Sequence, residues 1–121
     1  MSMDILLKNL KVIISAGGSG IGKAILERFH AQGAKIATCD INPDLVKTLK
    51  DDYPDIYAEV VDVSDEHAVE SFCSNALEKL GGLDCLINNA GIAGPTSKIE
   101  EIGTADWAEC LNICLTSQFL L

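Results

Sequence analysis

The sequence KVIISAGGSGIG, residues 11–22, joins a short β-rich run to a glycine-rich segment. The apolar run predicts a strand, and the glycines that follow are too dense for regular structure. A helical pattern then begins, with Ile21, Ile25 and Phe29 spaced four apart on one face. A strand, a glycine loop and a helix in this order predict a loop whose backbone N–H groups can approach a phosphate.

Short apolar runs alternate with helical patterns along the rest of the chain, and expected turns separate them. This pattern predicts parallel βαβ units, and therefore an α/β domain with about four strands in an open sheet and helices on both faces. The expected later strands are 36–39, 56–61 and 85–87, the expected N-caps are Ser64 and Thr104, and the expected left-handed helix end is Gly33.

Composition narrows the class of protein. The 121 residues suit one domain, and 9 Lys plus Arg against 18 Asp plus Glu give a net charge of −9. This acidity argues against nucleic acid and anionic membranes as partners. The chain has no apolar run long enough to span a bilayer, and residues 1–11 lack the features of a signal peptide. Five cysteines without a CxxC motif predict reduced thiols and a cytoplasmic location.

An acidic residue ends the second predicted strand. Asp40 lies 40 − 20 = 20 positions after Gly20, where dinucleotide-binding proteins place an acid on the ribose hydroxyls. A carboxylate there repels a 2′-phosphate, and neither Ser19 nor Ile41 offers a cation, so NAD is favoured over NADP. The alternative role for Asp40 is that of a solvated carboxylate in a turn.

The glycine loop also fits a second motif. Gly17 to Gly22 followed by Lys23 has the P-loop spacing, but Ala24 stands where a P-loop has the hydroxyl that binds Mg²⁺. A P-loop-like nucleotide phosphohydrolase is therefore a distant alternative. Lys23 is expected to be a solvent-facing helix residue.

Four motifs occur in order along the chain. They are the loop end Gly20-Ile21-Gly22, the acid Asp40, the pair Asp62-Val63 after the third strand, and Asn88-Asn89-Ala90-Gly91 at the start of a loop predicted over 88–95. Together they resemble the N-terminal half of a classical short-chain dehydrogenase/reductase. The resemblance covers essentially the whole chain and implies the N-terminal portion of a Rossmann-type doubly wound parallel sheet.

The resemblance also implies a function and a site. Residues 1–121 would be the NAD(P)-binding Rossmann domain of an oxidoreductase that transfers a hydride between nicotinamide and an alcohol or carbonyl substrate. NAD is the expected cofactor, and no metal is expected. The implied cofactor-binding residues are Ala16, Ser19, Gly20, Ile21, Gly22, Asp40, Ile41, Asp62, Val63, Asn89, Ala90 and Gly91.

The chain departs from the family pattern in two ways. The family's opening Thr-Gly is Ser15-Ala16 here, which keeps the hydroxyl but adds a methyl group that either crowds the pyrophosphate or requires a different turn. The family's catalytic Ser and Tyr-x-x-x-Lys do not occur in residues 1–121, since neither Tyr53 nor Tyr57 has a Lys four positions later. The alternative function is therefore a non-catalytic dinucleotide-binding fragment.

One catalytic residue is implied within the last helix. Trp107 and Asn112 match the family's fourth-helix pattern, in which Asn continues a proton relay to the catalytic Lys. An Asn between Leu111 and Ile113 is costly to bury unless it is hydrogen-bonded. A bond from its side chain to the preceding turn is the alternative interpretation of this position.

The end of the chain indicates a longer protein. The last helix runs into the apolar residues Phe119–Leu121 with no capping signal, so the domain is expected to be truncated at its C-terminus. The fourth strand would then be an open sheet edge. By the resemblance, the full-length protein is expected to be a homo-oligomer, a dimer or tetramer, formed through the helix that begins near Thr104.

The remaining candidate residues are expected to be structural. Cys110 and Cys114 share a helix face and are expected to be buried or interface thiols, because a metal would need further ligands. His67 is expected to face solvent. The aromatic residues expected in the core are Phe29, Phe72, Trp107 and Phe119.

Overall fold

The strands of the computed structural model, which describes residues 8–92 and 97–121, form one parallel sheet. The order across the sheet is β3 (Tyr57–Val60), β2 (Lys35–Asp40), β1 (Lys11–Ser15) and β4 (Cys85–Ile87). All four predicted strands are confirmed, and β4 lies at an edge as expected. The end of the predicted loop, at Pro95, lies outside the described residues.

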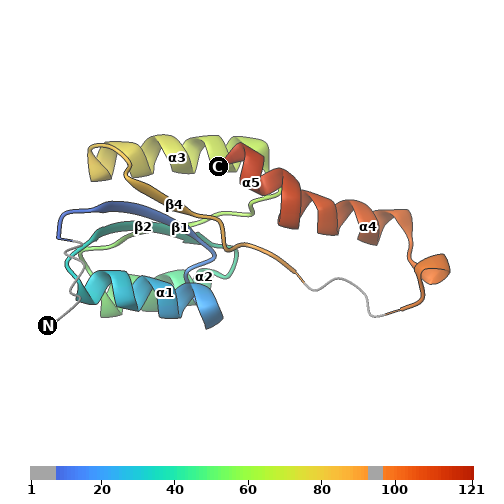
Figure 1. Ribbon diagram of the computed structural model, residues 1–121, viewed down its shortest axis with the longest axis horizontal. Coiled ribbons are helices and arrows are strands. Elements are labelled where there is room, and N and C mark those ends of the chain that lie inside the picture. Colours follow the sequence, from blue (N-terminus) through green and yellow to red (C-terminus); the bar gives the residue numbers. More distant parts are fainter. Residues whose placement is uncertain (1–7, 93–96) are drawn as a thin grey trace, which may run out of the picture.

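Helices cover both faces of this sheet (Figure 1). One face carries α1 (Gly20–Ala31) and α2 (Pro43–Asp52), and the other carries α3 (Glu66–Leu80). The last elements are the 3-10 turn η1 (Ile99–Glu101), α4 (Thr104–Leu111), the π-helical segment η2 (Asn112–Thr116) and α5 (Ser117–Leu120). This arrangement is the predicted Rossmann-type α/β fold.

Two apolar clusters, one on each face, hold the layers together. Val12, Ile14 and Ile36 point towards α1 and α2, where Leu26 completes the first cluster. The second cluster lies under α3 and includes Phe72, which is fully buried. Side chains of a strand alternate between the two faces, so a single buried strand such as β1 contributes to both clusters.

Two predicted helix caps are wrong. The Ser64 hydroxyl donates to Asp62 Oδ1 at 2.7 Å, so Ser64 belongs to the preceding turn, and the Asp65 carboxylate caps α3 by accepting the Ala68 N–H at 3.1 Å. Helix α4 begins at Thr104 itself, and its N-cap is Gly103 with no side-chain bond. The two predictions differ from the structure by one residue each. At α3 the neighbouring Asp65 competes with Ser64 for the same cap, whereas at α4 the helical geometry already begins at Thr104.

The first residue of the predicted apolar stripe of α1 and two predicted core aromatics are more exposed than expected, whereas Ile25 and Phe29 pack against the first cluster. Ile21 is 76% exposed, because α1 turns Gly22 and Leu26 towards the sheet. Trp107 and Phe119 are 55% and 86% exposed and are not core residues. Within the described part of the chain, no surface buries these two side chains.

The last helices form one long rod that leaves the body of the domain. In Figure 1, α4 projects away from the sheet, whereas α5 returns to the end of α3. The π-helical segment η2 lies between them and adds one residue to a turn of the rod. Within residues 8–92 and 97–121, no helix is both long and apolar enough to cross a membrane.

Candidate functional site

The predicted site residues follow the carboxyl ends of the four strands, which meet at one edge of the sheet (Figure 1). Strand β1 leads into the glycine loop, β2 ends at Asp40, and β4 leads into the loop that begins at Asn88. In open α/β sheets, ligands bind in the crevice at this edge, where the strand order reverses. Here the reversal falls between β1 and β4.

A pair of polar side chains ties the first and last of these loops together. The Ser15 hydroxyl accepts the backbone N–H groups of Asn89 at 2.9 Å and Ala90 at 3.0 Å. In return, the Asn89 side-chain amide donates to the carbonyl oxygens of Ser15 at 3.2 Å and Ala16 at 3.1 Å. We call this set of bonds the Ser15–Asn89 clamp. It holds two loops, which are more than seventy residues apart in sequence, in one geometry.

The clamp explains one of the glycines. A Cβ added at Gly22 would overlap both the Ala16 carbonyl oxygen and Asn89 Nδ2. Both atoms belong to the clamp, so any side chain at Gly22 would displace it. The backbone of α1 can therefore approach the loops only with glycine at this position.

Ala16 adopts the backbone conformation that glycine favours. Its φ is +56°, in the left-handed region, which a Cβ atom makes unfavourable. The methyl group therefore strains this left-handed turn without preventing it.

We expect Ala16→Gly to raise the free energy of unfolding by about 0.5–1 kcal/mol. Relief of the left-handed strain outweighs the greater freedom that glycine gives the unfolded chain. Denaturant unfolding of the two proteins measures this difference. Ala37→Gly is the matched control. Ala37 is buried in β2, so this substitution is expected to lower the free energy of unfolding. A lower stability for Ala16→Gly would contradict the strain argument.

Asp40 is held at the rim of the site by backbone groups. The residue is 8% exposed, Oδ2 accepts the Gly18 N–H at 3.0 Å, and Oδ1 accepts the Asn42 N–H at 3.1 Å. Each carboxylate oxygen can accept more than one hydrogen bond, so acceptor capacity remains for a ligand. Asp40 is therefore not the freely solvated carboxylate of the alternative interpretation.

A pocket of about 200 Å³ lies between these loops, beside Asp40. Seven of the predicted residues line it: Ala16, Asp40, Ile41, Asp62, Val63, Ala90 and Gly91. Its walls are largely apolar, with carboxylates at the rim. This lining suits a flat aromatic base with a hydroxylated sugar beside it.

The structure places the other predicted residues around this pocket. Ser19, Gly20 and Ile21 are exposed at the start of α1, Asn89 belongs to the clamp, and Gly22 lies against it. Asn112 is exposed, so water can solvate its amide and it needs no bond to the preceding turn. It is the first residue of the π-helical segment, a type of distortion that often marks functional sites.

Sequence reasoning missed several residues of the site. The family pattern marks Ser15 only as a residue that keeps a hydroxyl, although that group is central to the clamp. Other pocket residues lack a motif that could have revealed them, because they come from strand ends, from the loop after β4, from α4 and from η2: Cys39, Val61, Ile92, Glu109 and Ile113. Burial raises the pKa of the Cys39 thiol to about 12, so this pocket cysteine stays protonated at neutral pH.

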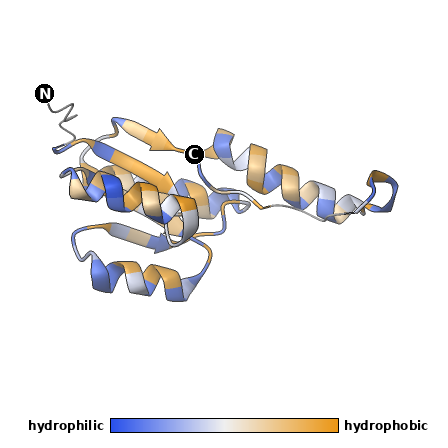
Figure 2. Cartoon of the chain, turned by 60° about the horizontal axis from the view of Figure 1, so that its bottom comes forward, coloured by the Kyte–Doolittle hydropathy of each residue, from blue (hydrophilic) through white to orange (hydrophobic). Residues whose placement is uncertain are grey.

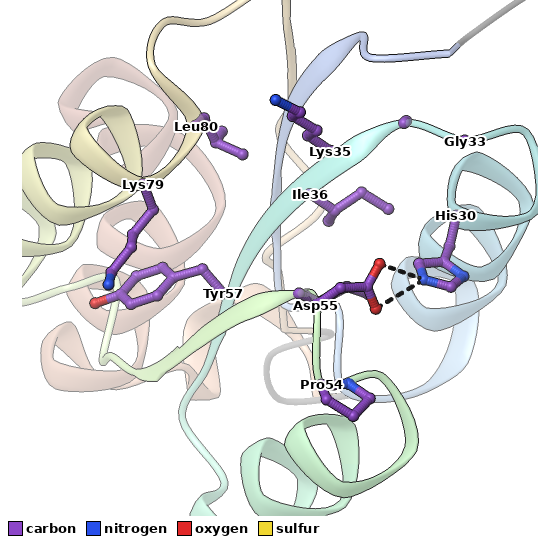
Figure 3. Close-up of a pocket in the computed structure, with 11 residues that line it drawn as sticks. His30, Gly33, Lys35, Ile36, Pro54, Asp55, Tyr57, Lys79 and Leu80 are labelled. Atoms are coloured by element: carbon purple, nitrogen blue, oxygen red, sulfur yellow. Dashed lines mark hydrogen bonds and ion pairs between the residues drawn. The ribbon is translucent and has the colours of Figure 1, made fainter.

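A larger pocket, of about 630 Å³, lies at the opposite end of the strands, where β2 and β3 begin (Figure 3). It is bordered by Lys35, Tyr57 and Lys79, and by an ion pair in which His30 Nε2 lies 3.0 Å from Asp55 Oδ2. None of the predicted site residues lines it. We assign the site to the smaller of these two pockets, because it lies at the carboxyl ends of the strands and the larger one does not. Across the two described ranges, His, Cys, Asp and Glu side chains form no group of three or more that could hold a metal ion.

A parallel sheet with a glycine loop and rim carboxylates at its carboxyl edge is typical of dinucleotide-binding α/β domains. Residues 11–121 match the family model described as short chain dehydrogenase. The chain therefore belongs to the short-chain dehydrogenase family, as the four motifs predicted. The family match favours this interpretation over the P-loop alternative.

Individual relatives agree with the family assignment. Levodione reductase from Leifsonia aquatica is 35% identical over 115 residues, which cover 90% of this chain and 43% of the relative. A crystal structure of a 3-ketoacyl-(acyl-carrier-protein) reductase from Brucella melitensis, complexed with NADH, matches with a TM-score of 0.89 and 26% identity over 94% of this chain and 47% of that one.

A second Brucella melitensis structure, a short-chain dehydrogenase/reductase of the glucose/ribitol dehydrogenase type, matches with a TM-score of 0.91 and 30% identity. That match covers 98% of this chain and 52% of the other. The chain thus spans about half the length of the relatives that it matches.

Proposed function

We propose that this chain forms the dinucleotide-binding part of an NAD-dependent oxidoreductase, which transfers a hydride between nicotinamide and an alcohol or carbonyl substrate. The observation that carries the proposal is the pocket at the carboxyl edge of the sheet, with Asp40 and Asp62 at its rim and the Ser15–Asn89 clamp behind it. The NADH-bound relative supports the same class of cofactor. The cofactor supplies the hydride chemistry when it is bound.

Each part of the site has a proposed role toward this cofactor. Asp40 accepts hydrogen bonds from the adenosine ribose, and Asp62 with Val63 borders the adenine. Ala90 and Gly91 form the wall on the side of β4. The pyrophosphate lies over the glycine loop at the N-terminus of α1, where backbone N–H groups and the helix dipole favour negative charge; the loop residues assigned to it are Ala16, Ser19, Gly20, Ile21 and Gly22.

The choice of NAD over NADP rests on the anchored carboxylate. Because Gly18 and Asn42 donate to both oxygens of Asp40, the charge cannot swing away from a 2′-phosphate. The next residue, Ile41, is exposed and offers no positive charge. Like charges placed close together in a partly dry site cost several kcal/mol.

Calorimetric titration of the protein that contains this chain tests the proposal. NAD should bind with one site per chain, and NADP should bind at least about 100-fold more weakly, a difference of about 2.7 kcal/mol. Equal or tighter binding of NADP would contradict the assignment of Asp40. Absence of binding for both would contradict the function.

Asn112 is proposed to be the residue that continues a proton relay through water. The relay would pass to a Tyr and Lys pair that residues 1–121 do not contain. Its exposed amide at the start of the π-helical segment leaves it free to hold a water molecule. The alternative, a binding domain without chemistry, applies to the 121 residues taken alone.

We further propose a homo-oligomer in a cytoplasmic location, with a small-molecule substrate and without nucleic-acid or membrane partners. The net charge of −9 and five free cysteines support these choices. The contact surface is an apolar strip along the projecting rod, here called the α4 face, made of Trp107, Leu111, Leu115 and Phe119. Figure 2 shows hydrophobic residues along this rod.

We expect Leu115→Glu in the full-length protein to raise the dissociation constant of the oligomer at least about tenfold, or 1.4 kcal/mol. Leu115 is 63% exposed at the middle of the α4 face, so a charge there would be desolvated in an interface. Sedimentation at several protein concentrations measures the change. Leu77→Glu, on the exposed side of α3, is the matched control and should leave the oligomer intact. An unchanged dissociation constant for Leu115→Glu would exclude the α4 face.

A further inference from the structure

Two cysteine side chains face each other on the last helices. Cys110 Sγ lies 3.9 Å from Cys114 Sγ, and both residues are half-buried. Their spacing of four places them on one face of the rod, across the junction between α4 and the π-helical segment. The two thiols thus lie within hydrogen-bond distance of each other and form no disulfide.

One of the two sulfurs also holds the loop that follows β4. Cys114 Sγ accepts the Ile92 N–H at 3.4 Å and donates its proton to the Ile92 carbonyl oxygen at 3.4 Å. Ile92 is a wall residue of the nucleotide pocket, as are Glu109 and Ile113, which flank the cysteines in sequence. The thiol pair therefore lies directly behind one wall of that pocket.

We propose that Cys110 and Cys114 form a dithiol site for a thiophilic centre that bridges both sulfurs, such as a trivalent arsenical, and that occupation of this site weakens nucleotide binding in the adjacent pocket. The first part stands on the sulfur geometry alone. The second part rests on the proposed function, because it needs a nucleotide in the pocket.

The sulfur separation favours a bridging atom over a disulfide. A disulfide bond is about 2.05 Å long, so the sulfurs would have to approach by about 1.9 Å, against the helix backbone, and an oxidant would be needed. A bridging arsenic atom sits between the sulfurs and leaves them more than a bond length apart. The distance of 3.9 Å therefore suits a chelated centre with little movement of the helix.

The binding reaction balances without a change of oxidation state. An arsenoxide carries one As=O group, and each thiol contributes one proton. Two As–S bonds form, the As–O bond breaks, and the oxygen leaves as water with the two thiol protons. The hydrogen bond with Cys114 and partial burial raise the pKa of the Cys110 thiol, so its proton is present at neutral pH for this condensation.

The same reaction removes the contact with the pocket wall. Once Cys114 has lost its proton to water, it can no longer donate to the Ile92 carbonyl oxygen. The sulfur also turns toward the bridging atom and away from the Ile92 N–H. The segment Gly91–Ile92 then loses the side chain that positions it, and the pocket loses a fixed wall. Nucleotide affinity should fall for this reason.

Phenylarsine oxide added to the full-length native protein tests the dithiol site. Intact mass should show one more phenylarsenic group per chain than in Cys110→Ser, and the fluorescence of Trp107, the single tryptophan of residues 1–121, should change because it lies one turn before Cys110. Cys110→Ser and Cys114→Ser should each weaken binding about 100-fold, since one thiol loses the advantage of chelation. The control Cys73→Ser, on α3, should bind normally.

Reversal separates chelation from simple modification of one thiol. A dithiol reagent such as 2,3-dimercaptopropanol should remove the arsenical, whereas an equal concentration of thiol supplied as 2-mercaptoethanol should not. Unchanged affinity in both Cys110→Ser and Cys114→Ser would overturn the proposed site. Failure of the native protein to take up the arsenical would do so as well.

Calorimetric titration with NAD tests the coupling. The arsenical should weaken NAD binding roughly tenfold, and NAD should weaken arsenical binding by the same factor, because coupling is reciprocal. Cys110→Ser keeps the contacts of Cys114 with Ile92, so its NAD affinity should be native and insensitive to the arsenical. Unchanged NAD affinity of the loaded native protein would overturn the coupling. If the untreated protein binds no NAD, the proposed function fails, while the arsenical stoichiometry still tests the dithiol site.

Discussion

Residues 1–121 on their own should bind NAD and show no NAD-dependent turnover of any alcohol or ketone. Hydride transfer to or from an alcohol needs a group that moves the hydroxyl proton. The two tyrosines of the chain are not placed to move that proton. Tyr57 borders the larger pocket at the opposite end of the strands, and Tyr53 packs against the His30 ring. Neither lines the nucleotide pocket.

The measurement is the absorbance of reduced nicotinamide during incubation with a panel of alcohols and ketones. The full-length protein, assayed on the same panel, is the positive control, and calorimetry with NAD shows that residues 1–121 are folded and loaded. Turnover by a soluble preparation of residues 1–121 that disappears in Asn112→Ala would place the chemistry within this chain. That result would refute its assignment to residues outside it.

Asp40→Asn should reduce the preference for NAD over NADP at least about 100-fold in the full-length protein. The substitution removes the charge that repels the 2′-phosphate and keeps one oxygen acceptor for the backbone N–H groups. A weaker hold on the glycine loop would affect both cofactors alike. The ratio of the two dissociation constants, measured by calorimetry, therefore isolates the effect of charge.

Asp44→Asn is the matched control for this experiment. It makes the same change of net charge on an exposed residue in the first turn of α2, four positions from Asp40. Its effect on the ratio should be below about threefold, because exposed charges are screened by solvent and salt. Equal effects of the two substitutions would mean that the general negative charge of the protein selects NAD.

The parts of the fold that depend on neighbours in sequence were predictable. The strand before the glycine loop, the left-handed Gly33 and the strand-end Asp40 each carry a signal within a few residues, and the structure has each of them in place. The predicted caps lie one residue away from the observed ones. For α3, Ser64 and Asp65 both satisfy the local rule, and only the turn at Asp62 decides between them.

The parts that depend on distant residues were not predictable in the same way. Nothing local to Ser15 shows that its hydroxyl receives two N–H groups from the β4 loop. Likewise, an apolar pattern shows that Trp107 and Phe119 suit burial, but it does not say which surface buries them. The loop holds Ala16 at a left-handed φ, although an alanine side chain disfavours that conformation. The residue type alone therefore does not predict it.

The Ser15–Asn89 clamp also determines at which stage of folding the chain becomes able to bind a dinucleotide. Its bonds close a separation of 74 residues, and β4, which follows β2 and β3 in sequence, pairs with β1 on the side away from them. Contacts of such high contact order form late, because the entropy of closing a long loop opposes them. A dinucleotide can therefore stabilise the completed sheet by mass action. It cannot assist the folding of a nascent chain while about the first ninety residues are still emerging from the ribosome.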